Sequence, residues 1–161
     1  MKYLFTILTS LQFCLSSYSQ GIDSKLWSIA KSEYPTDASM QKYVYDQQRK
    51  GYNYMVTVSD AEVKRFAVKE YPDDYSMQKY VYDKQYTDKA YMSRVTDMEL
   101  KRFALKEYPD DYSMQKYVYD KQSTDKEYMR RTTNNAAKIK AQREYPDDYS
   151  MQKYIYDKEA Y

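Results

Sequence analysis

The residues with the clearest potential for chemistry are acidic pairs that recur along the chain. Each pair follows a Tyr-Pro dipeptide: Asp73-Asp74, Asp110-Asp111 and Asp147-Asp148, with Thr36-Asp37 at the first equivalent position. Paired carboxylates can bind calcium or act as acid and base in hydrolysis. No EF-hand loop surrounds them, and sequence neighbours do not by themselves face one substrate from two elements. Helix capping is therefore the preferred interpretation, with calcium binding and catalysis as alternatives.

A second recurring set consists of tyrosines and lysines that follow these acids, in a chain with 23 tyrosines among 161 residues. Tyrosine offers a large contact area at small entropic cost, and its hydroxyl can form hydrogen bonds. The predicted binding surface comprises Tyr45, Tyr75, Lys79, Tyr82, Tyr112, Lys116, Tyr119, Tyr149, Lys153 and Tyr156. The alternative is that these side chains pack against a neighbouring repeat.

Glutamines recur beside the tyrosines, at Gln41, Gln48, Gln78, Gln85, Gln115, Gln122 and Gln152. Their amides could bind a peptide backbone or a sugar. Glutamine and tyrosine could equally satisfy one another between stacked helices, which is the preferred interpretation for Gln85.

Composition excludes several classes of site. The chain has no histidine, and Cys14 is its only cysteine, so neither a Ser-His-Asp nor a Cys-His arrangement can form. We therefore expect no catalytic residue, no metal site and no cofactor. Without Lys2, 25 basic side chains face 24 acidic ones, and neither charge forms a long block. A nucleic-acid partner is not expected.

The first residues have the layout of a secretory signal peptide. Lys2 precedes an apolar run from Tyr3 to Leu15, and small residues at Ser17 and Ser19 suit cleavage after Ser19. A membrane anchor and lipidation of Cys14 are the alternatives. Residues 1–19 are thus predicted to be a cleaved signal peptide, and the protein to be exported to the periplasm or the extracellular space, with no membrane span left after cleavage.

The stretch from Glu70 to Gln85 returns at a fixed spacing of 37 residues, which is typical of tandem repeats. The predicted units are residues 20–58, 59–95, 96–132 and a truncated, capping unit 133–161. Each unit is expected to hold two helices. A single hairpin of this size buries too little apolar surface to fold alone, so neighbouring hairpins must supply the core. The predicted fold is all-α: four helical hairpins stacked as a short α-solenoid or a compact helical array.

Local signals place the two helices of unit two. Ser59 and Glu62 fit a capping box, and apolar residues at Val63 and Ala67 form one stripe of the first helix. Pro72 ends that helix. The second helix is expected from Asp74 to about Tyr86, with a break or a frayed turn beyond it, because Gly51 occupies the corresponding region of unit one.

On the second helix, Met77, Tyr80 and Val81 are predicted to face the stack, which places Tyr75, Lys79 and Tyr82 on an outer surface. The architecture resembles the broad class of α-helical hairpin repeats, of which tetratricopeptide repeats are an example. Their period is 34 residues, however, and their proline lies elsewhere, so no functional residue is carried over.

We expect a non-catalytic, exported binding protein that contacts a protein or an envelope glycan through its tyrosine-rich surface. A carboxylate-based polysaccharide hydrolase and a purely structural envelope spacer are the alternatives.

Overall fold

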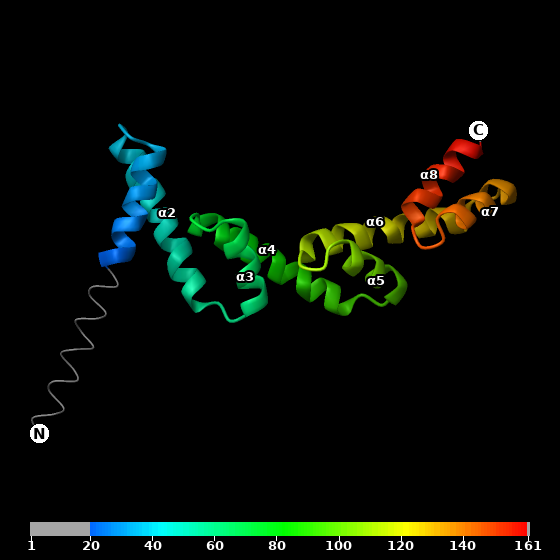
Figure 1. Ribbon diagram of the computed structural model, residues 1–161, viewed down its shortest axis with the longest axis horizontal. Coiled ribbons are helices and arrows are strands. Elements are labelled where there is room, and N and C mark those ends of the chain that lie inside the picture. The colour runs from blue at the N-terminus through cyan, green and yellow to red at the C-terminus, as the bar shows by residue number, and fades with distance from the viewer. Residues whose placement is uncertain (1–19, 161) are drawn as a thin grey trace, which may run out of the picture. The chain divides into compact units, whose positions relative to one another are not determined.

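A computed structural model describes residues 20–160, and these residues form helices joined by short loops, without a β-strand (Figure 1). Residues 20–33 are helical, and the later helices are α2 (Ala38–Thr57), α3 (Ala61–Glu70), α4 (Tyr75–Arg94), α5 (Met98–Glu107), α6 (Tyr112–Arg131), α7 (Asn135–Glu144) and α8 (Tyr149–Glu159). The all-α prediction is confirmed. The predicted signal peptide, residues 1–19, lies outside the described residues. Between residues 20 and 160, no helix is both long enough and apolar enough to cross a membrane.

The chain divides into two units, residues 1–81 and residues 82–161. In the first unit, the helix of residues 20–33 packs on α2, where the rings of Trp27 and Tyr45 stack with centroids 4.5 Å apart. In the second unit, the long helix α6 contacts both α5 and α8, and α7 packs on α8. A short helix packed on a long one is therefore the recurring element.

The short helices begin one residue later than a capping box requires. Asp60, not Ser59, caps α3, and its carboxylate accepts from the backbone N–H of Val63 at 3.1 Å. Asp97 caps α5 in the same way. The predicted capping box is wrong because the charged carboxylate of Asp60 interacts with the positive end of the helix and caps it. Glu62 is then the second helical residue, whereas a capping box needs a glutamate at the third.

The Tyr-Pro-Asp-Asp segments form the turn from each short helix to the next long one. Helix α5 ends at Glu107, and Tyr108, its C-cap residue, lies outside helical geometry before Pro109. The carboxylate of Asp111 then accepts from the N–H groups of Ser113 and Met114, both at 3.0 Å. The predicted role of the proline as helix stop is confirmed, and the predicted capping role of the aspartate pair is confirmed for its second member.

The long helices are continuous, so the predicted break after Tyr86 is wrong. Helix α4 runs on to Arg94, and α2 passes through Gly51 without interruption. Gly51 serves close packing instead: a Cβ atom added there would lie 2.2 Å from the backbone oxygen of Tyr75. Its missing side chain admits the start of the next long helix, which a sequence pattern cannot distinguish from a helix break.

The core of the second unit consists of two apolar clusters. One contains Met92, Leu100, Ala104 and Tyr119. The other contains Met129, Ala137, Ala141 and Tyr156. Each cluster combines the last turns of one long helix, the inner stripe of a short helix, and a tyrosine of the next long helix. The two clusters have equivalent members 37 residues apart, although the complete four-unit period remains a prediction from the sequence.

Candidate functional site

Three tyrosines of the predicted binding surface are buried. Tyr82, Tyr119 and Tyr156 are 4%, 9% and 7% exposed. Tyr119 and Tyr156 belong to the two core clusters. The hydroxyl of Tyr156 accepts a hydrogen bond from the backbone N–H of Asn134 at 3.3 Å. The expected exposure of these three rings is wrong, because a tyrosine can enter a core when its hydroxyl finds a polar partner.

The four remaining tyrosines of that surface are partly buried and hold contacts within their own unit. The hydroxyl of Tyr45 donates to Asp23 at 2.6 Å. Lysine ammonium groups lie over the rings of Tyr75, Tyr112 and Tyr149, at 5.5, 5.3 and 5.0 Å from their centroids. The three cation–π contacts join consecutive predicted repeats, as the alternative interpretation of packing against a neighbouring repeat expects.

The predicted lysines also lie over tyrosine rings. Lys79, Lys116 and Lys153 each stand 4.5 Å from a ring centroid, those of Tyr54, Tyr91 and Tyr128 respectively. In the second unit, Asp120 completes the group, since it pairs with Lys116 and accepts from the hydroxyl of Tyr91. The hydrogen bond to the Asp120 carboxylate raises the pKa of Tyr91 to about 12. Binding of a partner by this surface remains a prediction.

The glutamines bind polar groups of the protein itself. The Nε2 group of Gln115 donates to the backbone oxygens of Tyr108 and Pro109, at 2.7 and 3.2 Å. Gln85 reaches forward instead and bonds to Asp111 and to the N–H of Tyr112. Both glutamines are at most 4% exposed. The preferred interpretation of Gln85 as an internal partner is therefore confirmed, and Gln115 follows the same one of the two alternatives.

Sequence reasoning missed the tyrosines that are most exposed on the long helices. Tyr43, Tyr80, Tyr117 and Tyr154 occupy equivalent positions, and between 58% and 61% of each side chain is exposed. Tyr80 was expected to face the stack with Met77. The error arose because the long helices carry aromatic residues on opposite sides, so an apolar stripe does not identify the buried face. Recurrence of tyrosine at four equivalent positions does not identify this set, because Tyr45 and the buried Tyr82, Tyr119 and Tyr156 recur in the same way.

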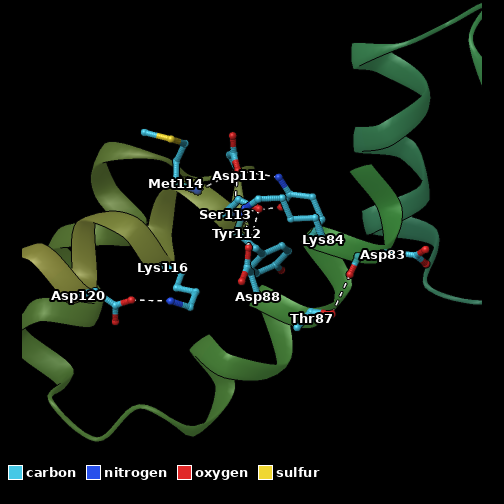
Figure 2. Close-up of polar contacts among 11 residues, drawn as sticks. Asp83, Lys84, Thr87, Asp88, Asp111, Tyr112, Ser113, Met114, Lys116 and Asp120 are labelled. Carbon is cyan, nitrogen blue, oxygen red and sulfur yellow. Dashed lines mark hydrogen bonds and ion pairs between the residues drawn. The ribbon is translucent and has the colours of Figure 1, made fainter. Parts of the chain in front are cut away.

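Tyr117 lies beside a groove of about 560 Å³ between α4 and α6 in the second unit. The other residues of the groove are polar or charged: Lys84, Asp88, Ser113, Lys116, Asp120, Lys121, Thr124 and Asp125. Figure 2 shows Lys84 and Asp88 of α4 close to Ser113 at the start of α6, with Lys116 and Asp120 on the next turns. The groove thus combines the exposed ring of Tyr117 with several hydrogen-bonding side chains.

The carboxylates of this groove already have partners. Asp88 pairs with Lys84 at 3.0 Å and accepts from the hydroxyl of Ser113 at 2.7 Å. Asp125 repeats this pattern with Lys121 and Ser150, at 2.8 and 2.7 Å. The long helices are therefore fixed to each other by buried aspartates, while the lysine ends stay partly exposed. Such a surface offers ammonium and hydroxyl groups to a polar ligand.

Within residues 20–160, no group of three or more His, Cys, Asp or Glu side chains is placed to hold a metal ion. No protein-family model, curated protein or solved structure matches this chain.

Proposed function

We propose that the protein is an exported, non-catalytic binding protein that contacts a protein or an envelope glycan through the exposed tyrosines of its long helices. The observation that supports this proposal is the position of Tyr117, which is 60% exposed beside the polar groove between α4 and α6. A ring next to hydrogen-bonding side chains suits both a sugar ring and a peptide segment.

Each unit carries two tyrosines at this most exposed, repeated position, Tyr43 and Tyr80 in the first and Tyr117 and Tyr154 in the second. Two rings on one unit allow a second contact to follow the first at high effective concentration, which strengthens weak individual contacts. Repetition of the ring along the chain therefore favours a partner with repeated features, such as a polysaccharide or an extended peptide.

The contacts of the acidic residues favour binding over hydrolysis. A glycosidase needs two carboxyl groups that flank one bond and are free to exchange protons. The second aspartate of each Pro-Asp-Asp segment instead caps a helix, as at Asp111 and Asp148. The groove carboxylates Asp88 and Asp125 are held by lysine and serine.

The test compares the wild-type chain with a variant in which Tyr43, Tyr80, Tyr117 and Tyr154 are changed to serine. Both proteins are immobilised and exposed to isolated cell-wall glycan and to envelope extract from the producing organism. We expect the wild type to retain a glycan or a defined protein that the variant does not retain. Circular dichroism verifies that both proteins remain helical.

A matched control changes Tyr34, Tyr71 and Tyr108, which are 36–37% exposed and lie in the turns before proline. This variant also loses aromatic surface but keeps the four rings of the long helices. Equal recovery of every partner by the wild type and the four-tyrosine variant would contradict the proposal.

A further inference from the structure

The outer side of α5 carries a surface that differs from the tyrosine groove. Met98, Lys101, Arg102 and Leu105 follow each other at helical spacing and so share one side of the helix, which we call the basic-apolar face. Met98 is 55% exposed and Leu105 38%. The opposite side holds Leu100 and Ala104, which are buried in the core.

The two cations of this face are not committed to internal ion pairs. Most lysines in the second unit bind a carboxylate, as Lys116 binds Asp120 and Lys126 binds Asp97 and Glu99. Lys101 and Arg102 have no ion-pair partner among the described residues of their unit. Their charges are therefore free to attract an anionic partner.

The acidic residues of α5 lie outside the basic-apolar face. Glu99 lies on the flank of the helix, where its carboxylate binds Lys126 at 2.9 Å and accepts from Tyr149 at 3.2 Å. At 100° per residue, Glu107 lies opposite the face. The face itself contains only basic and apolar side chains.

The same combination occurs on other short helices. In α3, Lys64 and Arg65 precede Val68, which is 39% exposed. In α7, Lys138 stands beside Ile139, which is 65% exposed. Exposed aliphatic side chains beside unpaired cations thus recur on short helices of both units, so the pattern does not depend on one helix end or one loop.

We propose that the basic-apolar face docks on the surface of an anionic lipid bilayer. Lysine and arginine are attracted to anionic headgroups, and the aliphatic side chains between them gain by entering the headgroup region. Nucleic acid and acidic glycans attract the cations equally well but give Met98, Leu105 and Ile139 no apolar environment.

The strength of this contact can be stated as a ratio of affinities. Each lysine or arginine near an anionic bilayer strengthens binding about fivefold at moderate ionic strength. Reversal of two charges therefore weakens binding to anionic vesicles about 20-fold or more. Since the attraction is screened by salt, added sodium chloride should weaken it as well.

The experiment measures co-sedimentation of residues 20–161 with vesicles of phosphatidylcholine alone or mixed with phosphatidylglycerol. We expect binding only to the phosphatidylglycerol vesicles. Two variants test the face: Lys101→Glu with Arg102→Glu, and Met98→Ser with Leu105→Ser. Both should reduce vesicle binding. The control variant carries Arg94→Glu and Lys158→Glu, which make the same change in net charge at exposed positions of α4 and α8. It should lose much less affinity for the vesicles.

Three outcomes would overturn the proposal. The first is the absence of binding to anionic vesicles by a wild-type protein that is helical by circular dichroism. The second is an equal loss of affinity in the control variant, which would indicate a general effect of net charge. The third is that the Met98→Ser, Leu105→Ser variant binds vesicles as tightly as the wild type, and that the wild type binds single-stranded RNA as tightly as it binds vesicles. This result would assign the face to a polyanion instead.

Discussion

Gln85 of α4 holds the start of α6 through both atoms of its amide. Its Nε2 group donates to Asp111 Oδ1 at 2.6 Å, and its Oε1 atom accepts from the N–H of Tyr112 at 2.7 Å. Gln122 makes the same two bonds to Asp148 and Tyr149. One buried side chain therefore positions the helix cap of the following repeat and satisfies a backbone donor that the helix leaves unpaired.

Replacing Gln122 by leucine tests this link. The change removes two hydrogen bonds and leaves the N–H of Tyr149 without a partner in a partly buried site, so we expect a loss of about 1–3 kcal/mol in the free energy of unfolding. Urea unfolding followed by circular dichroism measures it. Gln142→Leu is the control, because Gln142 is exposed on α7. Equal unfolding midpoints for the two variants would show that the link adds no stability.

The two aspartates of one Pro-Asp-Asp segment should differ sharply in their contribution to stability. Asp111 caps α6 and accepts from Gln85, whereas Asp110 is exposed. We expect Asp111→Ala to cost about 1–2 kcal/mol, in the range for lost helix caps, and Asp110→Ala to be nearly neutral. Hydrogen exchange should show faster exchange at Ser113 and Met114 in the first variant alone. A comparable cost for both variants would contradict the assignment of the cap to the second aspartate.

The sequence predicted those features that depend on local geometry. Proline after Tyr108 and the aspartate two residues later act within one turn of backbone, so their roles could be deduced without knowing the neighbours. Which tyrosines are buried could not be deduced in this way. Tyr80 and Tyr82 are two residues apart and chemically identical, yet Tyr80 is 61% exposed and Tyr82 4%. Only the neighbouring helices decide which ring is covered.

Glycine was misinterpreted for a related reason. Gly51 lies inside α2, and its role depends on the distance to Tyr75, which is 24 positions further along the chain. The groove beside Tyr117 likewise joins residues of α4 and α6. Contacts across such separations follow from how the helices pack, and no local pattern of hydrophobic residues encodes them.

Gly51→Ala should destabilise the protein even though alanine favours helices. Alanine gains about 1 kcal/mol over glycine in a helix interior. Here its Cβ would lie 2.2 Å from the Tyr75 oxygen and 2.4 Å from the Tyr75 carbonyl carbon, both of them backbone atoms. The helices must therefore separate, and we expect a net loss of about 1–3 kcal/mol, as for overpacked cores.

Thermal unfolding of Gly51→Ala is best compared with that of Gly21→Ala. A Cβ atom at Gly21 meets nothing within 4 Å, and the residue lies in the first helix, so this control should be neutral or slightly stabilising. An increase in melting temperature for both variants would exclude the close approach of α2 to Tyr75.

Acid should weaken the contact between Asp97 and Lys126. The hydrogen bond from Lys126 lowers the pKa of Asp97 below its ordinary value of 3.8, helped by the backbone N–H of Leu100. Because the folded-state pKa is the lower one, the contribution of Asp97 is complete above pH 3.8 and is lost as the pH falls through the folded-state value. The pair is partly exposed, so its contribution at neutral pH is at most about 1 kcal/mol.

The substitution Asp97→Asn removes the negative charge but keeps the helix cap. Asparagine caps helices as well as aspartate does, and Asn134 already fills the equivalent position before α7. We expect the variant to be slightly less stable than the wild type at neutral pH and to show a smaller loss of stability as the pH falls below 3.8. Urea unfolding at a series of pH values measures both, with Asp110→Asn as the control at an exposed carboxylate. Parallel pH profiles for the wild type and Asp97→Asn would show that the charge of Asp97 does not contribute to stability, because a native pKa equal to the unfolded one gives no pH-dependent term.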